Sequence, residues 1–174
     1  SMKTSKALMT VAAMTAILSA CGGGGGSGGE SHSAYSITLR SDKPQLPLNV
    51  DRYPVGQGVY APFSTTLYVN AQEGGRPIPG GEKDIFACNM AGGLDSGSLY
   101  YLDGDPEHEE EVDDGNGGKV KIPKAYRSIT LGSNAGGNSF HFHAGNQAGT
   151  ATITCSVEDP RDKRQISSSV EITV

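Results

Sequence analysis

Residues 139–157 have the sequence SFHFHAGNQAGTATITCSV, which predicts two antiparallel strands joined by a polar turn. In the second half, Ala151, Ile153, Cys155 and Val157 alternate with hydroxyl-bearing side chains. A period of two residues is typical of a strand that buries one face and exposes the other. This stretch therefore indicates an antiparallel β fold.

The chain from Tyr35 onward continues this pattern, because short apolar segments alternate with Gly, Pro, Asn and Asp and no long amphipathic helix is present. An all-β fold follows. Four prolines after the first predicted strand favour an extended crossing rather than a central strand. The strands are expected at Tyr35–Arg40, Ser64–Ala71, Lys83–Met90, Ser98–Leu102, Tyr126–Leu131, Asn138–His143, Gly149–Val157 and Gln165–Val174.

The charge of the chain is concentrated in one segment. The 174 residues suit one compact domain, and the formal net charge is −5. Eight carboxylates and no Lys or Arg lie within Asp103–Asp114, so the remainder carries +3. Neither a basic face nor an aromatic platform is evident, and we therefore exclude nucleic acid as a partner.

The N-terminal segment predicts export. Residues 1–20 combine Lys3 and Lys6 with an apolar stretch that is too short to span a bilayer, which indicates a signal peptide. The run Leu18-Ser19-Ala20-Cys21 resembles the lipobox of bacterial lipoproteins. The resemblance implies that Cys21 is lipidated, with palmitate among its acyl chains, and attaches the protein to a membrane.

Residues 21–33 follow as a tether, because Gly22–Gly29 offers almost no side chains to bury. By the same resemblance, Gly rather than Asp after the lipidated cysteine implies retention at the outer membrane. The folded domain is then expected to face the periplasm or the cell exterior.

Several segments resemble bacterial immunoglobulin-like domains of the invasin and intimin type. Residues 37–39 are similar to their first strand, residues 66–80 to their second strand and the turn after it, and residues 168–174 to their last strand. The resemblance covers residues 34–174. It implies an Ig-like antiparallel β-sandwich of about seven to eight strands, with an acidic loop at 103–118 as an insertion.

The two remaining cysteines fit such an exported domain. Once Cys21 is assigned to lipid, Cys88 and Cys155 form an even pair in an oxidising compartment, so we expect a disulfide. Each shares its strand face with apolar residues. Both sulfurs are therefore expected to point into the core.

Two histidines offer a candidate metal site. His141 and His143 are two residues apart, so on a strand they project from the same face and two imidazoles can share one zinc or copper ion. The alternative is that both are exposed polar residues alternating with buried Phe140 and Phe142.

The acidic segment offers a second candidate. Asp103, Asp105 and Glu107 are hard oxygen ligands of the kind that calcium prefers, although the spacing is not that of an EF-hand loop. The alternative is a solvated loop of mutually repelling charges.

Catalytic motifs are absent from the sequence, which has no Gly-x-Ser-x-Gly and no histidine with an obvious carboxylate to orient it. We therefore expect no enzymatic activity and no obligatory cofactor. The main hypothesis is an outer-membrane lipoprotein whose domain binds an unidentified protein or glycan at the cell surface, as in adhesion. The alternative is an envelope metal-binding protein that uses the histidine pair or the acidic loop.

Overall fold

The structure is a computed structural model that describes residues 34–56, 58–78 and 83–174. The predicted signal peptide (1–20), Cys21 and the tether (21–33) lie outside these ranges.

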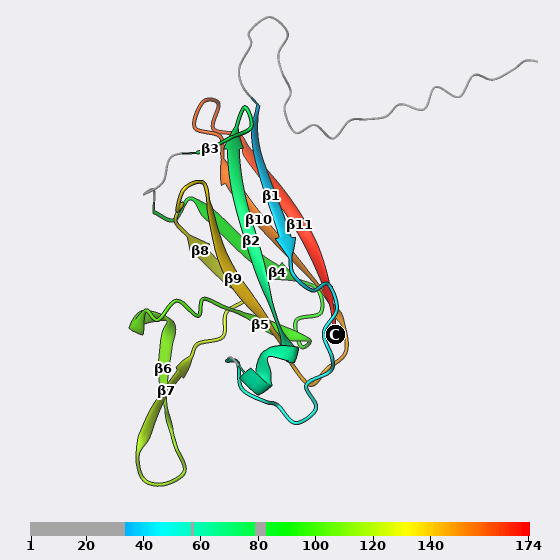
Figure 1. The fold of residues 1–174 in the computed structure, drawn as a ribbon, viewed down its shortest axis with the longest axis vertical. Coiled ribbons are helices and arrows are strands. Elements are labelled where there is room, and N and C mark those ends of the chain that lie inside the picture. The colour runs from blue at the N-terminus through cyan, green and yellow to red at the C-terminus, as the bar shows by residue number, and fades with distance from the viewer. Residues whose placement is uncertain (1–33, 57, 79–82) are drawn as a thin grey trace, which may run out of the picture.

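Two antiparallel sheets pack face to face (Figure 1). In each sheet the strands are given in the order in which they lie side by side. The first sheet contains β1 (Tyr35–Ser41), β2 (Ser64–Glu73), β9 (Gly137–Ala144) and β5 (Gly97–Tyr100), with the short β3 (Arg76–Pro77) paired to β2. The second contains β11 (Gln165–Thr173), β10 (Thr150–Glu158), β4 (Phe86–Ala91) and β8 (Ser128–Leu131). Each of the eight predicted segments overlaps one of these strands, so the predicted all-β sandwich is confirmed.

The core lies between the two sheets and follows the predicted alternation. Phe140 and Phe142 of β9 have no exposed surface, and the alternate residues of β10 from Ala151 to Val157 are buried opposite them. Burying a large apolar side chain contributes about 1.5–3 kcal/mol relative to leaving it exposed. The alternation in residues 139–157 therefore supplies much of the driving force for joining the sheets.

The disulfide joins Cys88 of β4 to Cys155 of β10, with an S–S distance of 2.04 Å. The two residues lie directly opposite each other in the register of these neighbouring strands. Both are buried in the core. The bond therefore connects two strands of one sheet, rather than the two sheets of the sandwich.

The acidic segment is more regular than the predicted loop at 103–118. It contains the short 3-10 helix η2 (Pro106–His108) and β6 (Glu109–Asp113), which pairs with β7 (Lys119–Pro123). The loop prediction is wrong here because two lysines of β7 lie opposite carboxylates of β6, Lys121 against Glu111 and Lys119 against Asp113. Opposite charges across a strand pair are stabilising and offset the repulsion within the acidic run.

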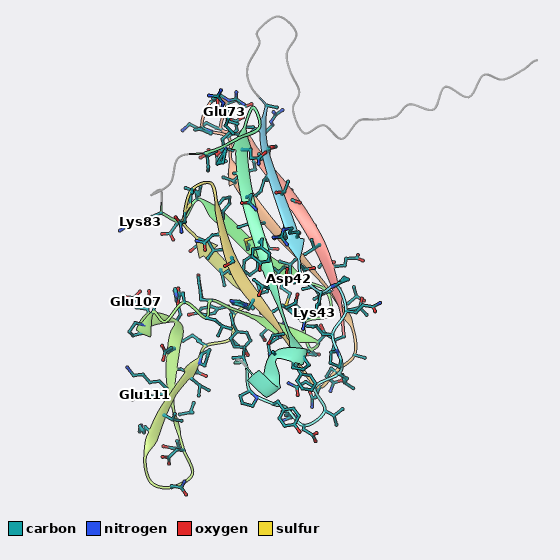
Figure 2. The ribbon with its side chains drawn as sticks, in the orientation of Figure 1. Asp42, Lys43, Glu73, Lys83, Glu107 and Glu111 are labelled. Carbon is teal, nitrogen blue, oxygen red and sulfur yellow. A yellow bond between two sulfur atoms is a disulfide. The ribbon has the colours of Figure 1, made fainter. Side chains whose placement is uncertain are left out.

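This β6–β7 hairpin projects from the sandwich, and Figure 2 shows the side chains of Glu111 on it and of Glu107 on η2 before it, away from the two sheets. Its second face carries Glu110 opposite Ile122 and Val112 opposite Val120, which is 46% exposed. The hairpin therefore presents a ladder of charges on one side and an open valine pair on the other.

The segment between β1 and β2 makes the extended crossing that its prolines predict. It pairs with the end of β11 through hydrogen bonds from Leu46 N to Thr173 O (2.9 Å) and from Thr173 N to Pro44 O (2.9 Å). It then runs on to Asn49, whose N donates to Gly145 O at 2.9 Å, and ends in the 3-10 helix η1 (Gly58–Phe63). This path lays residues 49–53 against the end of β9.

Gly97 on β5 provides a test of the packing against β9. A Cβ at this position would meet the ring of Phe142 and lie 2.5 Å from the carbonyl oxygen of His143. We expect Gly97→Ala to lower the free energy of unfolding by about 1–3 kcal/mol, measured by urea denaturation. Ser98→Ala, at the next position and facing away from the core, is the control and should change it little. Equal effects of the two substitutions would contradict the packing described here.

Candidate functional site

The predicted histidine pair lies on the outer face of the first sheet, opposite to the buried face of Phe140 and Phe142. The expected burial of the two phenylalanines is confirmed. The expectation of two exposed histidines is wrong, because His143 is only 6% exposed and His141 is half-buried. The crossing segment around Asn49 lies over His143, and the sequence pattern of β9 does not predict this.

Hydrogen bonds use both ring nitrogens of His143. Its Nε2 lies 2.7 Å from the carbonyl oxygen of Tyr53, and its Nδ1 lies 2.6 Å from Ser64 Oγ. Since a carbonyl only accepts, Nε2 carries the proton and Nδ1 accepts from the Ser64 hydroxyl. A metal ion at His143 would have to break one of these bonds. The geometry therefore gives His143 a structural role in holding the crossing segment, whereas His141 Nδ1 lies 3.2 Å from Thr66 Oγ1 of the neighbouring strand β2.

These histidines make stability depend on pH. Burial lowers the pKa of His141, and burial, opposed by the hydrogen bond to Tyr53, lowers the pKa of His143. The unfolded chain therefore takes up protons near pH 6.5, where the folded chain does not, so the free energy of unfolding falls as the pH drops through about 6.5. Urea denaturation between about pH 7.5 and about pH 5.5 should show this fall. The double variant His141→Gln, His143→Gln should show a smaller one, and an unchanged pH dependence in that variant would contradict the assignment.

The second candidate site lies where the hairpin leaves the sandwich. The His108 ring stacks on Tyr101, with centroids 3.6 Å apart and an interplanar angle of 7°, and meets Tyr126 edge-on. The Tyr101 hydroxyl donates to Thr130 O and accepts from Thr130 N, both at 3.0 Å. These contacts fix the imidazole of His108 against β8 and the sandwich.

Two of the predicted acidic ligands come together with this histidine. Asp103 Oδ2 lies 2.8 Å from His108 Nδ1, and one ligand atom from each of Asp103, Asp105 and His108 lies within 4.8 Å of the others. The three residues line a hollow of about 310 Å³, together with Glu109 and Pro123.

Glu107 was expected as the third candidate ligand, but the structure brings His108 to Asp103 and Asp105 in its place. Glu107 takes part through its backbone, whose N donates to Asp105 Oδ1 at 2.9 Å. His108 comes close to the two aspartates because η2 turns the chain back on itself. The backbone N of His108 donates to Asp105 O at 3.0 Å within this turn. The spacing of residues alone carries no signal for that turn.

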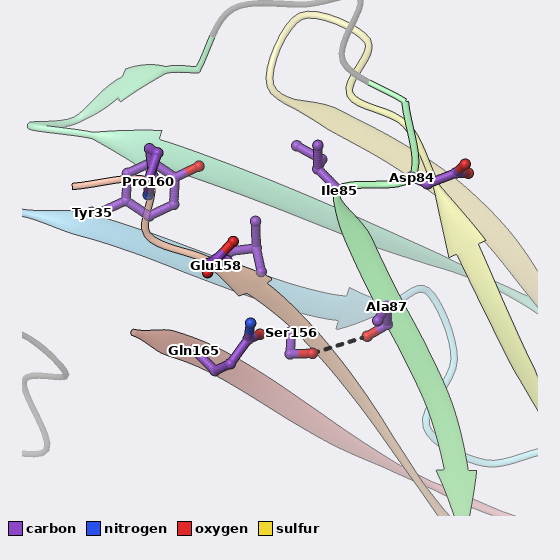
Figure 3. A pocket seen from close by; sticks show the side chains of 9 residues that line it. Tyr35, Asp84, Ile85, Ala87, Ser156, Glu158, Pro160 and Gln165 are labelled. Atoms are coloured by element: carbon purple, nitrogen blue, oxygen red, sulfur yellow. Dashed lines mark hydrogen bonds between the residues drawn. The ribbon is translucent and has the colours of Figure 1, made fainter. Parts of the chain in front are cut away.

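Another hollow lies near the start of β1 and is shown in Figure 3. It has a volume of about 410 Å³ and is lined by polar groups that include Asp84, Ser156, Glu158 and Gln165. Ser156 Oγ donates to Ala87 O at 3.4 Å. Tyr35 also lines it but is only 9% exposed, so its ring offers little contact surface.

The outer faces of the two sheets differ in chemistry. On the first sheet, Tyr68, Tyr100 and His141 share the outer face, and the Arg40 guanidinium lies 4.1 Å above the Tyr68 ring. On the second sheet, the outward positions of β10 are three threonines, a serine and Glu158 at the end of the strand. Tyrosine and arginine are enriched in binding surfaces. The outer face of the first sheet therefore has the composition more typical of a binding surface.

No helix among the described residues has both the length and the apolar character needed to cross a bilayer.

Comparisons with known proteins identify no family for this chain. No family model matches it, and no curated protein matches it. Two solved structures show a distant likeness. One is a conjugative transposon lipoprotein from Bacteroides eggerthii DSM 20697, with a TM-score of 0.33 and 14% identity over 79% of this chain and 94% of that one. The other is a conjugate transposon protein from Bacteroides vulgatus, with a TM-score of 0.38 and 14% identity over 79% of this chain and 84% of that one.

Proposed function

We propose that the chain is a lipid-anchored protein of the bacterial outer membrane whose Ig-like sandwich binds a protein or glycan ligand and has no enzymatic activity. The lipobox-like run ending at Cys21 supports the anchor. The glycine-rich tether that follows supports a domain held away from the membrane surface.

The strand order supports an Ig-like sandwich. If β1, β2, β4, β5, β9, β10 and β11 are taken as strands A to G, the first sheet has the order A-B-E-D and the second contains G-F-C. This is the arrangement of immunoglobulin-type sandwiches. The chain departs from it by adding β8 beside β4 and by placing the β6–β7 hairpin between β5 and β8.

One observation carries the binding role. The described chain begins at one end of the sandwich, and the β6–β7 hairpin projects beyond the sheets near the other end (Figure 1). A membrane attachment before Tyr35 therefore leaves the hairpin pointing away from that attachment. Projecting segments held by a rigid scaffold commonly carry recognition.

Removing the hairpin tests this role. The backbone N of Lys124 donates to His108 O at 2.9 Å, so residues 109–123 can be replaced by a short glycine-containing turn without opening the sandwich. The labelled wild-type protein is expected to bind intact cells or isolated envelopes saturably, and the shortened variant to lose at least tenfold in affinity. A variant with Thr152 and Thr154 of the second sheet changed to alanine is the control. Equal binding by the shortened variant and wild type would contradict a role for the hairpin.

The side of the membrane is tested separately. Protease added to intact cells that produce the lipidated protein should remove the domain while a periplasmic control protein stays whole, if the domain faces the exterior. Protection of the domain, with the purified protein shown to be cleavable, would place it in the periplasm and limit its ligands to envelope components.

A further inference from the structure

We propose that Asp103, Asp105 and His108 bind a divalent transition-metal ion, of the chemistry of Zn²⁺, at the base of the β6–β7 hairpin. The three residues are the one group of three His, Cys, Asp or Glu side chains that the described part of the chain brings within ligand distance. The proposal goes beyond the binding role above and does not depend on it.

The donor set selects the class of ion. It combines one imidazole nitrogen with two carboxylate oxygens, which suits zinc and its neighbours in the first transition series. Calcium takes six to eight oxygen ligands and gains little from an imidazole. The site therefore differs from the calcium site that the acidic composition alone suggests.

The distances are close to those of a metal site. Two ligands of a tetrahedral zinc ion lie about 3.4 Å apart, given bond lengths near 2.1 Å. Asp103 Oδ2 and His108 Nδ1, now 2.8 Å apart, would separate slightly as the ion replaces the proton between them. The ligand atoms are all within 4.8 Å of one another, so binding the ion would require the largest separation to close by at most about 1.4 Å.

Groups outside the cluster hold the imidazole in place. The His108 ring is parallel to Tyr101 and edge-on to Tyr126, and the Tyr101 hydroxyl is fixed by the backbone of Thr130. A ligand ring that is already immobile loses little conformational freedom when the ion binds. The adjoining hollow of about 310 Å³ leaves room for the ion and for water at its open positions.

The position of the site gives the ion a mechanical effect. Asp103 and Asp105 follow β5, whereas His108 directly precedes β6, so a bound ion ties the sandwich to the hairpin. An isolated two-stranded hairpin is marginally stable in water. Metal binding is therefore expected to order the hairpin relative to the sheets.

The test is a titration of the full chain with Zn²⁺, followed by NMR and by calorimetry. Saturable binding should shift the ring nitrogen signals of His108 and the backbone signals of residues 103–109. Asp105→Asn, which keeps the size of the side chain, and His108→Ala should each weaken binding at least tenfold. His141→Ala is the matched control, because it removes an imidazole elsewhere, and should bind as wild type does.

Three results would overturn the proposal. The first is a titration in which His108 does not shift. The second is an unchanged Zn²⁺ affinity in folded Asp105→Asn protein. This variant remains informative even if His108→Ala weakens binding only by disturbing the stack on Tyr101. The third is a Ca²⁺ titration that produces the same shifts at equal or lower concentration, since it would indicate a site that selects hard ions.

Discussion

Replacing both Cys88 and Cys155 by alanine is expected to lower the free energy of unfolding by roughly 4 kcal/mol. The bond closes a loop with a sequence separation of 67 residues, and the chain-entropy model gives a stabilisation of that size. Most of β4 to β10 lies within this loop, including the β6–β7 hairpin. Domains are stable by only about 5–15 kcal/mol, so the loss would remove a large share of the total.

Urea denaturation of the oxidised wild type, the reduced wild type and the double variant measures this effect. Reduction of wild type should lower its unfolding midpoint toward that of the double variant, while the double variant itself should not respond to reductant. In protein produced without lipidation, Cys21→Ala is the control for the loss of a thiol that the disulfide does not use. A double variant as stable as oxidised wild type would show that the bond contributes nothing to stability.

Phe142→Ala is expected to lower the free energy of unfolding by about 3–5 kcal/mol. The side chain has no exposed surface, and Gly97 of β5 lies against its ring. Truncation would lose the transfer free energy of the ring and leave a cavity between the sheets that neighbouring side chains fill only in part.

Leu94→Ala is the matched control, because Leu94 is 44% exposed and its truncation removes apolar surface without opening the core. It should change the free energy of unfolding by less than about 1 kcal/mol. Comparable losses for Phe142→Ala and Leu94→Ala would contradict the inward direction of Phe142 and the register of β9.

The sandwich could be predicted because the alternation of buried and exposed residues is visible within each strand of the sequence. The alternation around Ile153 sets one buried face on β10, and a strand with one buried face has its register strongly constrained. The same alternation places Cys155 in the core, and on β4 it places Cys88 there as well. The oxidising compartment and the even number of remaining cysteines then suffice to predict the disulfide between them. The sequence does not show, however, that the two strands are neighbours in one sheet.

The candidate site was predicted less well because its geometry depends on contacts between distant residues. β6 was missed since five consecutive positions from Glu109 to Asp113 contain four carboxylates, and only the lysines of β7 make a strand there favourable. His108 was missed because a 3-10 turn, and the ring of Tyr101, bring it to Asp103. His143 is buried because the crossing segment runs over it. The alternation of residues in β9 does not predict the path of that segment.

The pairing of β1 with β2 determines how the domain would respond to force. Each of the seven residues of β1 has a partner on β2, from Tyr35 opposite Glu73 to Ser41 opposite Leu67. A pull between a membrane attached before Tyr35 and a ligand held at the hairpin would run along the long axis of the sandwich, parallel to these strands (Figure 1). The hydrogen bonds between β1 and β2 would then be loaded in shear and would have to break together, whereas peeling would break them one at a time. If the chain is anchored before Tyr35 and binds its ligand through the hairpin, as proposed above, the pairing of β1 with β2 is expected to keep the domain folded under tension between these two points.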